Sequence, residues 1–359
     1  KYLESNTNVA QGTATNIITG FNSNGYAIGS GGYSNENTTN YVSWTFKKAP
    51  KFFDIVTYTG NDTRNTQISH NLGSVPGMII VKKTSASGFW PVYHIGATSS
   101  DYYLRLNETN AEAEDGTMFD AAPTSTYFTI GDNSNINQNG ATYVAYIFAH
   151  NNNDGDYGDD ADQDIIKCGY YTGDGGAGTT TVDLGFEPQW ILVKASSAAD
   201  NWYMIDNMRG WATHDNTAND AYVLSNESNS EATGGVLDIT STGFKTTLYT
   251  NANANGRNYI YMAIRRGPMA TPETASSVFD GAINFDENNE PGFNSGFVTD
   301  MHLHRQPQTS DEFKFYTRLM GKKYLRFDTS LSENSDSNYK SDFMDGVDVG
   351  GNDNFDGWL

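Results

Sequence analysis

Short runs in which apolar and polar residues alternate recur along the whole chain, separated by turns rich in Gly, Asn, Asp and Thr. One run, Tyr143–Phe148, carries aromatic or aliphatic side chains at every position, as expected for a central strand with both faces buried. Six or so such runs occupy each stretch of roughly 110 residues, and no apolar pattern of helical period is sustained. The pattern predicts an all-β protein built from β-sandwich or jelly-roll units.

These runs are repeated. The stretch Asn71–His94 reads "NLGSVPGMIIVKKTSASGFWPVYH", and Asp183–Gly210 begins "DLGFEPQWILVKASSAADNWYMID". Four pairs keep one spacing of 112 residues: Leu72/Leu184, Pro76/Pro188, Lys82/Lys194 and Trp90/Trp202. A fixed period indicates copies of one structural unit. We therefore expect tandem, superposable β-sandwiches at residues 51–150 (unit 1) and 165–268 (unit 2), with Trp90 and Trp202 as equivalent core anchors.

The two ends of the chain also resemble each other. "KYLESNT" at Lys1–Thr7 matches "KYLRFDT" at Lys323–Thr329, 322 residues later. Residues 1–50 are therefore interpreted as the closing part of a unit, and residues 269–359 as a divergent, partial third unit (unit 3). Unit 3 is expected to lack its closing strand, whose counterpart "NYVSWTF" lies at Asn40–Phe46. Neighbouring chains, the other end of the same chain, or further units of a longer array could each supply that strand.

The composition limits the function. The chain of 359 residues has 22 Lys and Arg against 43 Asp and Glu, a net charge of −21, which repels polyphosphates and anionic membranes. Nucleic-acid binding is not expected, and neither is membrane insertion, because no apolar run approaches the roughly 20 residues that span a bilayer. The aromatic content of 13% exceeds what disordered chains contain.

One segment suggests a metal site. Residues 151–164, expected to form an acidic linker between units 1 and 2, read "NNNDGDYGDDADQD". Carboxylate oxygens spaced along a glycine-containing loop suit Ca²⁺, although the spacing is not that of an EF-hand. The alternative is a solvated linker without a metal. The candidate Ca²⁺ ligands are Asp154, Asp156, Asp159, Asp160, Asp162 and Asp164.

Other reactive residues do not form a catalytic pattern. Cys168, the only cysteine, is expected to be a buried strand residue rather than a nucleophile. His302 and His304 are two residues apart and would share one face of a strand, as a metal pair or as an exposed or interface pair. Surface positions are expected for His94, His150 and His214, and unit 2 has Asp206 where unit 1 has His94. We expect no enzymatic activity.

Trp211 has no counterpart in unit 1, which makes it the candidate for stacking on a glycan at the surface.

Several long phrases carry a resemblance to a family, among them "YVSWTFKKAPKFFDIVTYTGN", "NGATYVAYIFAHN" and "DQDIIKCGYYTG". They resemble the tandemly repeated tail or tail-fibre proteins of marine bacteriophages. The resemblance implies an extracellular structural protein of a virion tail, made of concanavalin-like or jelly-roll units, that contacts a host-surface glycan. The incomplete third unit is the reason to expect association with copies of the same protein. The alternatives are a filament subunit of non-phage origin and a carbohydrate-binding or glycan-degrading module.

Overall fold

The structure is a computed structural model. It describes residues 1–209, 211, 220–249, 251–267, 274–283, 292–305, 310, 312–320, 323–327, 329–336, 339, 346–348 and 356–358. In these residues antiparallel strands dominate, and no helix has the length and apolar character needed to cross a membrane. The all-β prediction is confirmed. The helices described are α1 (Ser134–Asn137), η1 (Asn207–Arg209), η2 (Ala275–Ser277) and η3 (Arg318–Met320).

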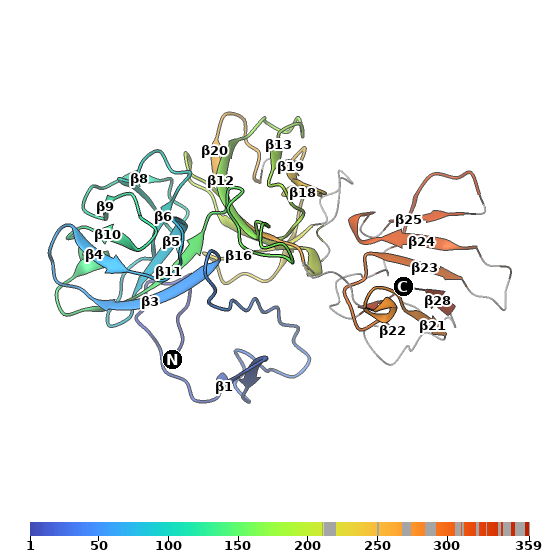
Figure 1. Ribbon diagram of the computed structural model, residues 1–359, viewed down its shortest axis with the longest axis horizontal. Helices are drawn as coiled ribbons and strands as arrows, with labels where there is room; N and C mark the ends of the chain where they lie inside the picture. Colours follow the sequence, from blue (N-terminus) through green and yellow to red (C-terminus); the bar gives the residue numbers. More distant parts are fainter. Residues whose placement is uncertain are drawn as a thin grey trace.

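Unit 1 is a two-sheet sandwich (Figure 1). Its large sheet has the strand order β3-β11-β5-β6-β7-β8, and its small sheet has the order β4-β10-β9. The apolar run recognised in the sequence is β11, which lies between β3 and β5 and is buried along most of its length. The strands are β3 (Phe53–Thr59), β4 (Thr66–Ser69), β5 (Pro76–Lys83), β6 (Pro91–His94), β7 (Tyr102–Arg105), β8 (Ala113–Glu114), β9 (Phe119–Ala121), β10 (Tyr127–Ile130) and β11 (Thr142–Ala149).

Unit 2 repeats this topology strand by strand. Its large sheet has the order β12-β20-β14-β15-β16-β17, and its small sheet has the order β13-β19-β18. The register agrees as well, since Met78 pairs with His94 and Trp190 pairs with Asp206, each residue shifted by 112. The predicted repeat is confirmed. The strands are β12 (Ile166–Thr172), β13 (Thr181–Asp183), β14 (Pro188–Ala195), β15 (Trp202–Asp206), β16 (Ala221–Leu224), β17 (Ala232–Thr233), β18 (Leu237–Thr240), β19 (Gly243–Thr246) and β20 (Asn258–Arg265).

Unit 3 has the same order in its large sheet, β21-β28-β23-β24-β25-β26, beside a β22-β27 pair. β28 occupies the central place that β11 and β20 hold, so the prediction that this unit lacks its closing strand is wrong. The sequence does not predict this strand, because the residues around it, "NDNFDGWL", lack the Tyr-rich alternation of the other closing strands. The strands are β21 (Gly281–Ile283), β22 (Phe293–Asn294), β23 (Met301–Arg305), β24 (Lys314–Thr317), β25 (Lys323–Arg326), β26 (Asn334–Ser335), β27 (Gly346–Val347) and β28 (Asp356–Trp358).

Residues 1–50, the N-terminal segment, lie to one side of units 1 and 2 in Figure 1 and contain β1 (Ile18–Asn22) and β2 (Gly25–Ile28). Near its start Tyr2 pairs with Gly12. The same ten-residue spacing recurs in the last two strands of each large sheet, which are β7–β8, β16–β17 and β25–β26. We call each of these strand pairs, with its connecting loop, the edge hairpin of its unit, and use the same name for residues 2–12. The equivalent pairs are Tyr103 with Ala113, Tyr222 with Ala232, and Tyr324 with Asn334.

The apolar core does not divide neatly by unit. One cluster fills unit 1 and continues onto the outer face of the large sheet of unit 2, where Trp190, Leu192 and Trp202 belong to it. A second cluster fills the space between the two sheets of unit 2. Trp90 and Trp202 are both buried at equivalent places, as predicted. Units 1 and 2 therefore share a continuous hydrophobic junction, which stabilises them as one body.

Candidate assembly interface

A buried lysine of unit 2 holds the edge hairpin of unit 1. Lys194, on β14, is fully buried. Its Nζ donates to three carbonyl oxygens, those of Ala195 at 2.6 Å, Ala198 at 3.2 Å and Thr109 at 3.2 Å. An ammonium group has three N–H donors, so each finds an acceptor. The Thr109 oxygen belongs to unit 1, and this bond crosses the junction.

Further bonds fix the same hairpin. The indole Nε1 of Trp202 donates to Arg105 O at 3.0 Å. Two backbone bonds join the units directly, from Glu112 N to Ser196 O at 2.7 Å and from Asp200 N to Thr109 O at 2.8 Å. We call this set of contacts between a Lys–Trp pair and the preceding edge hairpin the clasp.

The clasp is built a second time, between unit 1 and residues 1–12. Lys82 Nζ donates to Asn8 O at 3.1 Å and to Gly88 O at 2.6 Å, and Trp90 Nε1 donates to Thr7 O at 3.1 Å. The two backbone bonds recur at equivalent positions. They run from Gln11 N to Thr84 O at 3.0 Å and from Gly88 N to Asn8 O at 2.9 Å.

Burial changes the chemistry of both lysines. Removal of solvent lowers the pKa of Lys82 to about 8, with a smaller contribution from the neighbouring Lys83 charge. Removal of solvent likewise lowers the pKa of Lys194 to about 8. The carbonyl oxygens offset part of the cost of burying each ammonium group. Each lysine at the apolar junction is thus stabilised jointly by carbonyl oxygens of its own unit and by one carbonyl oxygen of the edge hairpin.

The junction between units 1 and 2 also contains His94. It was expected at the surface but is buried, because β6 ends against the central strand of unit 2. Its Nδ1 accepts from Gly96 N at 2.9 Å, and its Nε2 lies 3.0 Å from Tyr261 O. The ring is therefore neutral with the proton on Nε2, and burial lowers the pKa of His94 to about 4.

Close packing at this junction requires a glycine. A Cβ atom on Gly77 would lie 2.7 Å from His150 Cβ and 2.8 Å from Cys168 Cβ, closer than atoms can approach. Cys168 is a buried residue of β12, as predicted. Burial raises the pKa of its thiol, so the thiolate needed for nucleophilic attack is suppressed.

The junction between units 2 and 3 uses different chemistry. Arg318 is buried and pairs with both Glu187 of unit 2 and Asp300 of unit 3, and Arg266 also pairs with Asp300. A cavity of about 940 Å³ lies beside these ion pairs. Its lining is mostly apolar and includes Met208, Val278, Phe279, Val298 and Leu303.

The structure does not gather the acidic segment into a cluster. Asp164 accepts backbone N–H bonds from Asn153 and Gly155, at 2.8 and 2.9 Å, and so closes the loop on itself. Lys51 pairs with Asp156 at 2.8 Å. Within the described part of the chain, no three His, Cys, Asp or Glu side chains converge as metal ligands would. Ca²⁺ binding by Asp154–Asp164 stays a prediction.

Trp211 is not a surface residue. Its exposed fraction is 1%, it packs in the second cluster, and its Nε1 donates to Leu237 O. The prediction of glycan stacking by Trp211 is therefore wrong. Absence of a counterpart in unit 1 was a poor guide, because unit 2 uses this indole to fill its own interior.

The histidine pair of unit 3 is also buried. His302 and His304 share one face of β23, as predicted, with ring centroids 5.0 Å apart. They lie beside Tyr316 inside the sandwich instead of at a surface. Burial lowers the pKa of His302 well below its usual value, and the neighbouring His304 makes a smaller contribution in the same direction. His214 lies outside the described residues.

Sequence reasoning missed the clasp, although the constant Lys82/Lys194 and Trp90/Trp202 spacings were its signal.

Comparison with known families gives one match. Residues 1–268 match the model of a domain of unknown function, DUF7483, and the chain belongs to that family. No curated protein and no solved structure matches the chain. The match covers the N-terminal segment and units 1 and 2, which are the parts joined by the two clasps.

Proposed function

We propose that this member of the DUF7483 family is a structural protein of an extracellular assembly, of the tail or tail-fibre type found in bacteriophage virions. The observation that carries the proposal is the clasp, used once between residues 1–12 and unit 1 and again between units 1 and 2. A contact that repeats with the unit can join successive sandwiches into an array, as neighbouring repeats are joined in solenoid proteins, although unit 3 is joined to unit 2 by ion pairs instead.

The polar groups favour a structural role over catalysis. The junction histidine of unit 1, His94, is replaced by Asp206 in unit 2, which instead binds Arg209 at 2.7 Å. A reacting group has a fixed chemical role, whereas a structural position tolerates this exchange. The proposal therefore includes no catalytic step.

Association with further copies of the protein and contact with a host glycan are part of the proposal. The resemblance to phage proteins supports the tail location, while a filament of non-phage origin would use the same clasp. The burial of Trp211 removes the aromatic residue that had favoured a carbohydrate-binding module.

Electron microscopy tests the proposal. Negative-stain images of the purified protein should show elongated particles or fibres, and antibodies raised against it should label the tails of virions. A structural role in a tail would be contradicted if the purified protein forms single compact particles at all concentrations and the antibodies do not bind the tails of virions.

A further inference from the structure

The N-terminal segment contains the closing half of a sandwich, built as in the complete units. The hydroxyl of Tyr41 accepts a bond from Glu36 N at 2.9 Å and donates to Gly32 O at 2.9 Å. In unit 1 the hydroxyl of Tyr143 accepts from Gln138 N at 2.8 Å and donates to Ser134 O at 3.0 Å. The partners lie five and nine residues earlier in both cases. The turn before the closing strand is thus already formed.

The β1–β2 hairpin corresponds to the hairpin formed by β9 and β10 in unit 1. Gly29 N donates to Ile17 O at 2.7 Å, as Gly131 N donates to Met118 O at 2.8 Å. Ile28 then corresponds to Ile130, at the same spacing of 102 residues that relates Tyr41 to Tyr143.

The large sheet of this half-sandwich is missing. In unit 1, Ala145 of β11 pairs with Val56 on one side and with Val81 on the other. Residues 41–48 belong to no strand. Tyr143 is 1% exposed and stacks on Tyr58, with ring centroids 5.0 Å apart.

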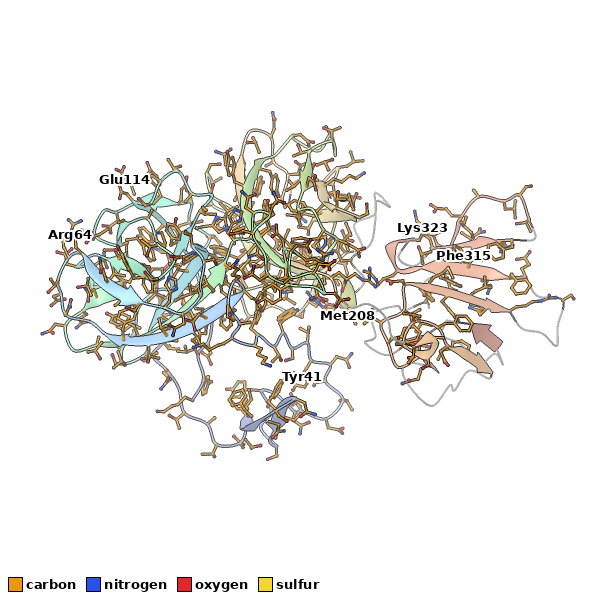
Figure 2. The ribbon with its side chains drawn as sticks, in the orientation of Figure 1. Tyr41, Arg64, Glu114, Met208, Phe315 and Lys323 are labelled. Atoms are coloured by element: carbon orange, nitrogen blue, oxygen red, sulfur yellow. The ribbon has the colours of Figure 1, made fainter. Side chains whose placement is uncertain are left out.

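The corresponding apolar groups of the N-terminal segment face solvent. Tyr41 is 48% exposed and Val42 is 42% exposed (Figure 2 labels Tyr41). Ile28 is 47% exposed, whereas Ile130 is fully buried. An apolar segment that takes the place of a central strand but has no strand on either side is a surface that another β-segment can complete.

The far end of the segment is anchored. The Phe46 ring lies 5.7 Å from that of Phe53, and Trp44 Nε1 donates to Asp206 at 3.1 Å. The incomplete half-sandwich is therefore held beside units 1 and 2 and presents its open side outward.

We propose that residues 13–50 form an acceptor surface for the first half of another repeat, with the sequence pattern of residues 51–101. Its strands would take the places of β3 and β5 on either side of residues 41–48, with a β6 equivalent beyond them. Units 1, 2 and 3 cannot donate these strands, because β3 and β5, β12 and β14, and β21 and β23 already pair with their own closing strands. The proposal rests on this geometry and not on the virion assignment.

A fusion protein tests the proposal. A second copy of residues 51–101 is joined ahead of Lys1 of the full chain, since Tyr2 corresponds to Tyr103 in the repeat. Hydrogen exchange followed by mass spectrometry is compared with that of the unextended chain. We expect exchange at residues 41–48 to slow by at least tenfold, because their N–H groups gain strand partners. The matched control carries Ile79→Asp and Val81→Asp in the appended copy alone, at two positions buried in unit 1, and should leave exchange unchanged.

Two results would overturn the proposal. One is unchanged exchange at residues 41–48 in the fusion, whether or not the appended segment is itself protected. The other is protection of residues 41–48 in the unextended chain that appears with rising concentration, because the occupant would then be a second copy of this chain. Neither result depends on the images of virions that test the proposed function.

Discussion

Replacement of Trp202 by Phe should weaken the junction between units 1 and 2 specifically. The change removes the indole N–H that donates to Arg105 O, while that oxygen keeps its bond from Glu108 N at 3.2 Å. The loss is therefore one net hydrogen bond, about 0.5–1.5 kcal/mol, without an orphaned carbonyl. The smaller ring leaves a void that costs about another 1 kcal/mol. Together these two losses should lower the free energy of unfolding by about 1.5–2.5 kcal/mol, measured by urea denaturation with circular dichroism as the signal.

A double-mutant cycle shows whether this loss belongs to the clasp. Trp202→Phe and Lys194→Met both release the edge hairpin of unit 1, so their effects should be non-additive by 0.5 kcal/mol or more, in the range of about 0.5–3 kcal/mol typical of shared contacts. Trp211→Phe is the matched control, since Trp211 is equally buried but bonds within unit 2. Additive effects of Trp202→Phe and Lys194→Met, or equal coupling for both tryptophans, would refute the reasoning.

Three further predictions concern the junction and the acidic segment. The pKa of His94 is lower in the folded state than in the unfolded state, so the stability that His94 contributes is present above about pH 6.5 and is lost as the pH falls toward 4. The urea midpoint should therefore fall less between pH 7 and pH 5 in the His94→Gln variant than in the unaltered protein. An equal fall in both proteins would contradict this. Gly77→Ala should destabilise the protein by about 1–3 kcal/mol in the same assay because its Cβ has no room, while Gly116→Ala, in open space, should not; equal effects would argue against tight packing. Calorimetry should detect Ca²⁺ binding to the full chain, abolished by Asp164→Asn, and no binding heat at millimolar Ca²⁺ would leave residues 151–164 as a solvated linker.

The repeat and its strands could be predicted because strand patterning and turn residues are local properties. Leu72 and Leu184 fill the same place in two sandwiches, and their spacing is visible in the sequence. β28 could not be recognised, because only three residues form it and its pairing with β21 and β23 joins distant parts of the chain.

The junctions were harder to predict because burial there depends on which face another unit covers. His94 and Trp211 were both predicted to lie at the surface, but unit 2 covers His94, and Trp211 fills the interior of unit 2. Nothing in the sequence marks Lys82 and Lys194 as buried, because their burial depends on carbonyl oxygens supplied by the edge hairpin and by the lysine's own unit. A conserved spacing between charged residues of two repeats was the usable signal.

The most direct test of the repeated clasp is hydrogen exchange at two equivalent backbone amides, Gly88 and Asp200, which donate to Asn8 O and Thr109 O. The account predicts protection of both in the full chain. Lys82→Met should accelerate exchange at Gly88 and leave Asp200 unchanged, and Lys194→Met should do the reverse. If either amide exchanges as fast as an exposed loop in the unaltered protein, or if both respond alike to each substitution, the two junctions are not built by the same independent clasp.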